Sequence, residues 1–324
     1  MNNGQLDATT LSLLREAHYK LLIINYKLIT PPMDQKIVDE LIQELIKLSF
    51  AEDIGDGDHT TLCCIPADAI GKQRLIVKEE GILAGVEIAE KVFHAFDPEL
   101  QMEVFIQDGT HVKPGDVAFV VTGKEQSLLQ TERLMLNIMQ RMSGIATMTA
   151  RYVKALEGTG TRVLDTRKTT PGMRILEKQA VKIGGGCNHR IGLFDMILLK
   201  DNHVDFAGGI HNAVTRAKQY LAQKGKNLRI EVEVRNFVEL DEALAEGVDR
   251  IMFDNFTPAD TARAVRHVAE WAQEHCVQRP ETESSGGITF DTMLPYAQAG
   301  VDFISFGALT HSVKGLDMSF KAVK

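Results

Sequence analysis

Basic side chains that could bind an anionic ligand are concentrated in residues 162–200. This stretch contains eight Lys and Arg residues against three Asp and Glu residues, so its formal charge is +5, whereas the whole chain carries −8. Like charges gathered in this way repel unless negative groups lie among them, and Arg can hold a carboxylate or phosphate with two parallel hydrogen bonds. A solvated basic face is the alternative, but several of these residues follow short apolar runs instead of lining one helix face. The stretch therefore predicts a site for carboxylates or phosphates.

Acidic residues and glycine-containing turns follow other apolar runs later in the chain. Glu233 and Asp254 end or follow two successive runs, where carboxylates could bind Mg²⁺ or ribose hydroxyls; a structural ion pair with Lys or Arg is the alternative. Ser285-Gly286-Gly287 and Gly307-Ala308 each follow a predicted strand and precede a predicted helix. Backbone N–H groups in such turns form phosphate sites. This pattern predicts a phosphorylated ligand.

The elements that would position these residues alternate between short apolar runs and helical patterns. The strand-like runs are 162–165, 196–199, 228–234, 249–253 and 301–306, and the helical patterns are 209–224, 237–246, 258–275 and 289–298. Such alternation is typical of parallel strands joined by right-handed crossovers and favours an α/β barrel, in which functional residues lie at the carboxyl ends of the strands. A sixth strand, within 277–285, is mostly polar and contains Pro280, so we expect it to be short or distorted.

The residues before 162 predict a separate α+β domain. An amphipathic helix at 33–50 is followed by strands at 75–78, 102–106 and 117–121, a helix at 87–96, and a helix at 125–155 with a break at Ser143-Gly144. We expect an extension at 1–32 that need not be ordered, a first domain at 33–142 with the tail 311–324 packed on it, and a catalytic barrel at 143–310. In residues 51–61, Asp53, Asp56, Asp58 and His59 could bind a metal, but Asp and Thr between glycines favour turns and helix caps.

The bulk composition excludes several classes of protein. With 324 residues, 44% hydrophobic and 25% charged, the chain resembles a soluble globular protein. Its pI of about 5.7 argues against general binding to nucleic acid or membrane surfaces, and no stretch approaches the ~20 apolar residues of a membrane helix. The four cysteines lack paired zinc-site spacing, so we expect a reducing, cytoplasmic location. Cys187, beside the basic stretch, is better explained as a small packing residue than as a nucleophile.

Long motifs occur in one order along residues 33–324. They are AEDIGDGDHTT, TERLMLNIMQRMSGIAT, DTRKTTPGMR, GGGCNHR, LLKDNH, FDNF, SSGGIT and ISFGALTHS. With these motifs the chain resembles quinolinate phosphoribosyltransferase, also called nicotinate-nucleotide pyrophosphorylase (carboxylating). The resemblance implies an incomplete parallel α/β barrel of about six strands after an N-terminal α+β sandwich domain. It also implies a Mg²⁺-dependent transfer from 5-phosphoribosyl 1-diphosphate to quinolinate, giving nicotinate mononucleotide, diphosphate and CO2 for NAD biosynthesis.

The resemblance also implies roles for individual residues. Quinolinate would bind to Arg133, Arg167, His189, Arg190 and Lys200. The phosphoribosyl donor would bind to Lys168, Lys200, Glu233, Asp254, Ser285, Gly286, Gly287, Gly307 and Ala308. Catalysis would depend on Lys168, His189, Glu233 and Asp254, and the Mg²⁺ would be held by Glu233 and Asp254, partly through diphosphate and water. Arg133 would reach into the site of a partner subunit, which implies a homodimer or a higher oligomer.

Three other functions are compatible with parts of the pattern. The first is a phosphoribosyltransferase homologue of molybdenum metabolism, but the complete TRKTTPG, NHR and KDNH motifs favour the quinolinate enzyme. The second is a Schiff-base aldolase that uses Lys200, although the charged run Lys200-Asp201-Asn202-His203 is unlike the apolar pocket that such a lysine needs. The third is a non-catalytic protein that binds a phosphorylated ligand.

Overall fold

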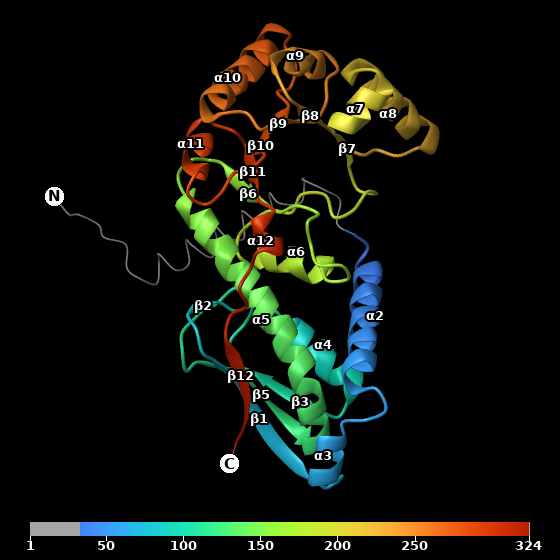
Figure 1. Cartoon of the computed structure of the whole chain (residues 1–324), viewed down its shortest axis with the longest axis vertical. Helices are drawn as coiled ribbons and strands as arrows, with labels where there is room; N and C mark the ends of the chain where they lie inside the picture. Colours follow the sequence, from blue (N-terminus) through green and yellow to red (C-terminus); the bar gives the residue numbers. More distant parts are fainter. Residues whose placement is uncertain (1–32, 324) are drawn as a thin grey trace, which may run out of the picture.

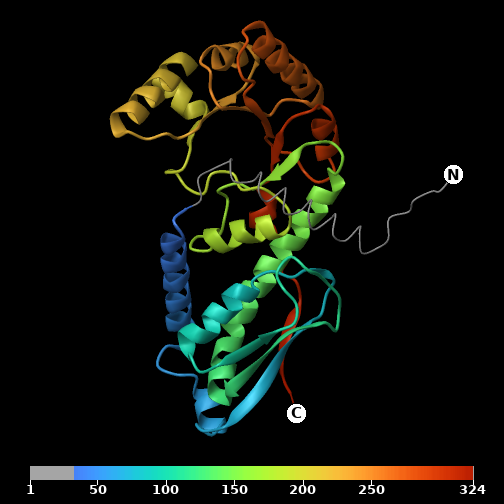
Figure 2. The same cartoon turned by 180° about the vertical axis from the view of Figure 1, so that it is seen from behind.

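The computed structural model describes residues 33–323. The expected extension at 1–32 lies outside the described residues. The described chain forms two α/β units that are stacked along the long axis of the molecule, with the long helix α5 running between them (Figures 1 and 2). Within the part of the chain that the structure describes, no helix is both long and apolar enough to cross a membrane.

The first unit is a four-stranded antiparallel sheet packed against helices. In chain order its elements are α2 (Gln35–Ile54), α3 (His59–Cys64), β1 (Ile70–Val77), β2 (Gly81–Ile82), α4 (Val86–Phe96), β3 (Gln101–Val104), β4 (His111–Val112) and β5 (Val117–Lys124). The sheet order is β12-β1-β5-β3, so the edge strand β12 (Met318–Ala322) comes from the end of the described chain and pairs with β1. Phe93 on α4 packs against Phe119 and Phe320, with ring centroids 6.2 and 5.8 Å away.

The predicted turn and cap function of residues 51–61 is confirmed at Asp58. This residue is the N-cap of α3, and its side chain accepts a hydrogen bond from the Thr61 backbone N–H. Such a cap satisfies one of the N–H groups that a helix leaves unpaired at its start.

Helix α5 (Glu125–Ala155) is continuous over 31 residues, so the break predicted at Ser143-Gly144 is wrong. Both residues have packing functions instead. The Ser143 hydroxyl accepts a hydrogen bond from the Ala84 N–H and donates one to the Ala84 carbonyl. A Cβ at Gly144 would lie 2.3 Å from the Lys314 carbonyl oxygen, so glycine lets the C-terminal segment cross the helix closely.

The second unit contains the six-stranded sheet, and its order β6-β11-β10-β9-β8-β7 confirms the predicted incomplete parallel α/β barrel. The strands are β6 (Arg162–Leu164), β7 (Ile197–Leu199), β8 (Ile230–Val234), β9 (Arg250–Asp254), β10 (Glu281–Ser285) and β11 (Phe303–Ser305). All neighbouring pairs are parallel. The helices are α6 (Arg174–Ile183), α7 (Asp201–Ala207), α8 (Ile210–Lys224), α9 (Phe237–Ala245), α10 (Pro258–Glu274), α11 (Met293–Gln298) and α12 (Ala308–His311). Helices α7 to α11 lie along the outer side of the sheet, whereas α6 and α12 lie next to α5, between the sheet and the first unit (Figure 1).

The expectation that the polar strand β10 is short or distorted is wrong: its five residues equal the length of β8 and β9 and exceed that of β6, β7 and β11. Its residues pair in continuous register with Arg250 to Asp254 of β9, and Pro280 lies just before the strand. Its polar side chains have partners: Glu281 contacts Arg250, and the Thr282 hydroxyl donates to Asp302. These contacts explain how a mostly polar segment can occupy the middle of a sheet.

Candidate active site

The basic residues predicted from the sequence follow the barrel strands at their carboxyl ends. Arg167 and Lys168 come after β6, and Lys200 comes directly after β7, where it is the N-cap residue of α7. The Lys200 ammonium lies 2.5 Å from Oε2 of Glu233 on β8. Asp254 is the last residue of β9, so cationic and anionic groups meet at one end of the barrel.

Asp165 organises the segment that carries Asn188, His189 and Arg190. This carboxylate is fully buried and accepts hydrogen bonds from Lys178 Nζ at 2.5 Å, Asn188 Nδ2 at 2.5 Å and the His189 N–H at 2.9 Å. Burial raises the pKa of Asp165, and the Lys178 charge opposes this change. The three bonds fix the segment against the end of β6.

Arg190 is buried, and it lies near enough to Arg167 for the two charges to affect each other. Burial lowers the pKa of Arg190, and the nearby Arg167 charge lowers it further. Nη1 of Arg190 donates to the Met196 carbonyl at 3.3 Å. Two neighbouring guanidinium groups could bind an anion with more than one negative group.

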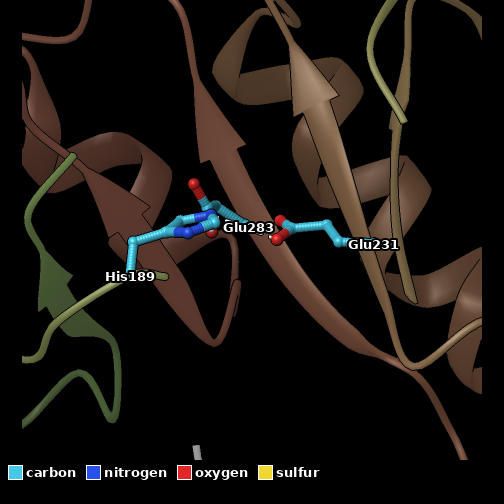
Figure 3. Close-up of side chains that lie close together, drawn as sticks. All are labelled: His189, Glu231 and Glu283. Atoms are coloured by element: carbon cyan, nitrogen blue, oxygen red, sulfur yellow. Dashed lines mark ion pairs between the residues drawn. The ribbon is translucent and has the colours of Figure 1, made fainter. Parts of the chain in front are cut away.

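The imidazole of His189 points towards the carboxylates of Glu231 and Glu283 (Figure 3). Its Nε2 atom lies 3.1 Å from Glu231 and 3.5 Å from Glu283, while its Nδ1 atom accepts a hydrogen bond from the Arg190 N–H at 2.7 Å. Burial lowers the pKa of His189, but the two carboxylates outweigh it, so the pKa is raised. Both ring nitrogens of His189 therefore face protein groups.

A buried guanidinium completes this cluster. Nη1 of Arg250 lies 3.4 Å from Glu283 and 3.9 Å from Glu231, and the Arg250 side chain is almost fully buried. Burial and the charge of Glu231 raise the pKa of Glu283 to about 7, whereas His189 and Arg250 overcome the effect of burial and lower the pKa of Glu231 to about 2. Near neutral pH the two carboxyl groups thus differ in charge.

His189, Glu231 and Glu283 also lie close enough to share a metal ion. The donor set fits Mg²⁺ poorly, because Mg²⁺ prefers oxygen ligands with room for water and these three groups are buried. Arg250 already supplies positive charge next to the same carboxylates. Glu233 and Asp254, at the carboxyl ends of β8 and β9, offer only carboxylate oxygens, which suit Mg²⁺ better than a set that includes an imidazole.

The two glycine-containing turns lie at the ends of β10 and β11. Gly286 has φ +99°, and a Cβ there would lie 2.2 Å from Oδ1 of Asn255, so only glycine fits this turn. A Cβ at Gly307 would lie 3.0 Å from Cδ of Lys168 and 2.9 Å from Nε2 of His311. The second turn is therefore in contact with the basic segment after β6.

Arg133 lies in the first half of α5, away from these residues. It lines a cavity of about 460 Å³ that is also bordered by α2 and by Thr170 and Met173. Arg133 precedes Arg141 by eight residues, which corresponds to ~12 Å along the helix. Arg141, and not Arg133, contacts the barrel side of the same chain, through Glu177.

Comparison with known proteins decides the family. The family model described as "Quinolinate phosphoribosyl transferase, N-terminal domain" matches residues 58–143, and the corresponding C-terminal-domain model matches residues 145–321. The chain belongs to the quinolinate phosphoribosyltransferase family.

Relatives in plants and bacteria match most of the chain. The chain is similar to "Quinolinate phosphoribosyltransferase [decarboxylating] 1b" of Nicotiana tabacum, with 43% identity over 86% of this chain and 82% of the relative. It is 42% identical to the "Probable nicotinate-nucleotide pyrophosphorylase [carboxylating]" of Bacillus subtilis, over 86% and 92% of the two chains. The solved nicotinate-nucleotide pyrophosphorylase of Francisella tularensis superposes with a TM-score of 0.80 at 39% identity, covering 88% of this chain and 96% of that one.

Several residues of this quinolinate phosphoribosyltransferase family member were not foreseen as parts of a site. Glu231 alternates with Glu233 along β8 and could have been found from the period of two in IEVEV. Glu283 lies within the polar stretch 277–285 and Arg250 within the strand-like run 249–253, and neither was predicted to belong to a site. The sequence offers no local signal for Arg250, because its partners lie on neighbouring strands that are distant in the sequence.

Proposed function

We propose that this chain transfers the phosphoribosyl group of 5-phosphoribosyl 1-diphosphate to quinolinate, with loss of CO2, to form nicotinate mononucleotide in NAD biosynthesis. The observation that carries the proposal is the meeting of cationic residues with Glu233 and Asp254 at one end of the barrel, in a chain of this family. A pyridine diacid requires fixed positive charge, and a sugar phosphate with a diphosphate leaving group requires a phosphate site and a metal ion.

The quinolinate carboxylates are assigned to Arg167 and Arg190, whose charges lie close together. We assign Lys200, which directly follows β7, to the same anion. We assign His189 to the same site. Its Nδ1 atom accepts a hydrogen bond from the Arg190 backbone N–H, and through this bond His189 positions Arg190. Because both its ring nitrogens face protein groups, direct contact with quinolinate would require the ring to turn.

The phosphoribosyl donor is assigned to the opposite side of the same barrel end. Its 5-phosphate would accept hydrogen bonds from the backbone at Ser285, Gly286, Gly287, Gly307 and Ala308. Glu233 and Asp254 would bind the ribose hydroxyls and Mg²⁺. Bound Mg²⁺ would neutralise charge on the diphosphate, and Lys168 and Lys200 would add ammonium groups to the same leaving group.

The reaction follows from these positions. The C1–oxygen bond to diphosphate breaks as Lys168 and Lys200 stabilise the departing charge, and the pyridine nitrogen, held in line by the arginines, forms the new bond to C1. The cationic ring then takes the electron pair of the adjacent carbon–carboxylate bond, CO2 leaves, and the ring carbon takes up a proton. Lys168 is better placed than His189 to stabilise that carbanion, since the His189 ring is engaged inside the barrel.

We propose that the active enzyme is a homodimer in which Arg133 completes the site of the partner. Its position on α5, about 12 Å along the helix from the contact between Arg141 and Glu177, supports a function outside its own barrel. The pairing of β12 with β1 supports the assignment of the tail 311–324 to the first domain.

Incubation with quinolinate, 5-phosphoribosyl 1-diphosphate and Mg²⁺ tests the reaction directly, with CO2 and the mononucleotide as readouts. Nicotinate should replace quinolinate poorly, because one carboxylate would be missing from a cationic site. If no mononucleotide forms, the proposal fails. A Schiff-base aldolase is disfavoured, because the Lys200 ammonium is paired with Glu233 and a Schiff base needs a neutral amine; trapping with borohydride would reveal one.

A further inference from the structure

A partly buried ion pair joins α5 to the basic segment that follows β6. Arg141 on α5 donates to Oε1 of Glu177 on α6 from Nε at 3.0 Å and from Nη2 at 2.8 Å. The Glu177 carboxylate is fully buried, and the Arg141 side chain is about a quarter exposed. Two parallel donors from one guanidinium fix both the distance and the orientation of the pair.

The same two side chains hold the two segments that carry the proposed substrate contacts. Oε2 of Glu177 accepts from the Thr170 N–H at 3.1 Å, and Nη2 of Arg141 contacts the Thr170 hydroxyl at 3.3 Å. Thr170 lies two residues after Lys168. Nη2 of Arg141 also donates to the Thr310 carbonyl, in the short helix α12 that follows directly on the turn at Gly307.

A further bond joins these two segments directly. The Thr310 hydroxyl is fully buried and donates to the Lys168 carbonyl at 2.8 Å. The Lys168 side chain also lies next to Gly307, as its Cδ is 3.0 Å from the place of a Cβ there. The residues 166–170 and the turn 307–310 are therefore held together by Arg141, Glu177 and Thr310.

We propose that Arg141 and Glu177 are positioning residues that couple the two substrate sites, so that a phosphate bound at the Gly307 turn favours the arrangement of residues 166–170 that binds quinolinate. This inference rests on the proposed function. Glu177 has no exposed surface, so it acts through Thr170 and Arg141 and not by touching a substrate. Loss of the pair would leave the bond between Thr310 and Lys168 as the remaining link between the two segments, and would keep Arg167, Lys168 and Gly307 in the chain.

The coupling can be measured as a binding cycle with ligands that do not react. Quinolinate affinity is measured by calorimetry with and without saturating ribose 5-phosphate, which carries the donor's phosphate but no diphosphate. In the wild type we expect ribose 5-phosphate to tighten quinolinate binding about fivefold or more, in the usual range of coupling between sites. In Glu177→Gln and in Arg141→Lys the factor should fall towards one.

Two further variants keep the test decisive. Glu239→Gln weakens the pair between Glu239 on α9 and Arg235, which precedes that helix. This variant should retain the wild-type factor, and it controls for a general effect of losing a carboxylate. Circular dichroism shows whether Glu177→Gln and Arg141→Lys fold. If they do not, Thr310→Val is used instead: it removes the hydroxyl that bonds to Lys168 and should by itself lower the coupling factor.

The outcomes separate this inference from the proposed function. Absence of coupling in the wild type, or full coupling in variants that fold, overturns the inference. Each preparation is also assayed with quinolinate and 5-phosphoribosyl 1-diphosphate, and a wild type that forms no mononucleotide refutes the proposed function instead. A wild type that turns over substrate without coupling refutes the positioning role alone.

Discussion

The ammonium of Lys200 and the carboxylate of Glu233 lie 2.5 Å apart across the ends of β7 and β8. Each group neutralises the other in the absence of substrate, and the Glu233 side chain is nearly buried while Lys200 remains half-exposed. A diphosphate or a carboxylate entering the barrel end could draw Lys200 away and free Glu233 for a cation or a ribose hydroxyl. The pair thus connects the proposed anion site with the proposed metal site.

Replacing both proposed metal ligands, Glu233→Ala with Asp254→Ala, should leave a folded protein with little activity. We expect turnover to fall by about 100-fold or more, because the diphosphate would lose the charge stabilisation that the carboxylates bring with Mg²⁺. Steady-state formation of the mononucleotide, together with thermal unfolding, checks the result. Turnover like that of the wild type would contradict the assigned roles.

The shared site predicts complementation between two inactive variants. Arg133→Ala and Arg167→Ala should each lose activity, but mixed dimers contain one site with both arginines intact. Exchange of subunits should therefore restore part of the activity, up to about a quarter of the wild-type value for random pairing of equal amounts in dimers. Each variant mixed with itself provides the control. No recovery after proven exchange would argue against a site built from two subunits.

The raised pKa of Glu283 predicts a pH dependence of stability. Its pKa in the folded protein, about 7, exceeds the ordinary value of 4.5, so the folded state binds more protons than the unfolded state between these values. The contribution of Glu283 to the free energy of unfolding therefore falls as pH rises from about 4.5 to about 7. The amide side chain introduced by Glu283→Gln does not titrate. The free energy of unfolding of this variant should therefore rise relative to that of the wild type between about pH 5 and about pH 8.

Denaturant unfolding of both proteins at several pH values measures this difference. Glu281→Gln is a matched control on the same strand. Burial raises the pKa of Glu281, but the charges of Arg250 and Arg229 outweigh this effect, so its pKa is lowered. A lowered pKa contributes stability that is lost only in acid, so this variant should run parallel to the wild type above pH ~5. Parallel curves for Glu283→Gln as well would show that Glu283 is not protonated in the folded state.

The close crossing at Gly144 predicts that Gly144→Ala destabilises the protein in spite of the higher helix propensity of Ala. The added Cβ would lie 2.3 Å from the Lys314 carbonyl oxygen, and relief of such overpacking typically costs about 1–3 kcal/mol. Asn137→Ala, at an exposed position of the same helix, should have a small or stabilising effect. Urea unfolding measures both, and equal stabilisation by the two changes would contradict the packing argument.

The sequence predicted the barrel well where strands are apolar, and less well where polar groups replace apolar ones. The runs at 162–165 and 249–253 became β6 and β9 with small changes in their ends, because buried parallel strands need continuous apolar residues. β10 is polar for a tertiary reason, since Glu281 and Glu283 contact Arg250. Ser143 and Gly144 resemble a helix break locally, and only their contacts with Ala84 and Lys314 explain why α5 continues.

The candidate site shows the same limit. Lys200, Glu233 and Asp254 were predictable because each ends or follows an apolar run, and the carboxyl ends of parallel strands meet. The buried partners Glu231, Glu283 and Arg250 were not, because their association depends on strand register and on which face of a strand points inward. Arg141 and Glu177 lie on helices, where an arginine or glutamate is usually a surface residue.

The pairing of β12 with β1 has a consequence for synthesis of the protein. β1 has a free edge until residues 318–322 arrive, and these follow every barrel strand in the sequence. During translation the outer edge of β1 therefore presents unpaired N–H and C=O groups until β12 has been made. Such an exposed edge can pair with strands of other nascent chains. A chain truncated before β12 should keep the edge of β1 exposed and should therefore aggregate.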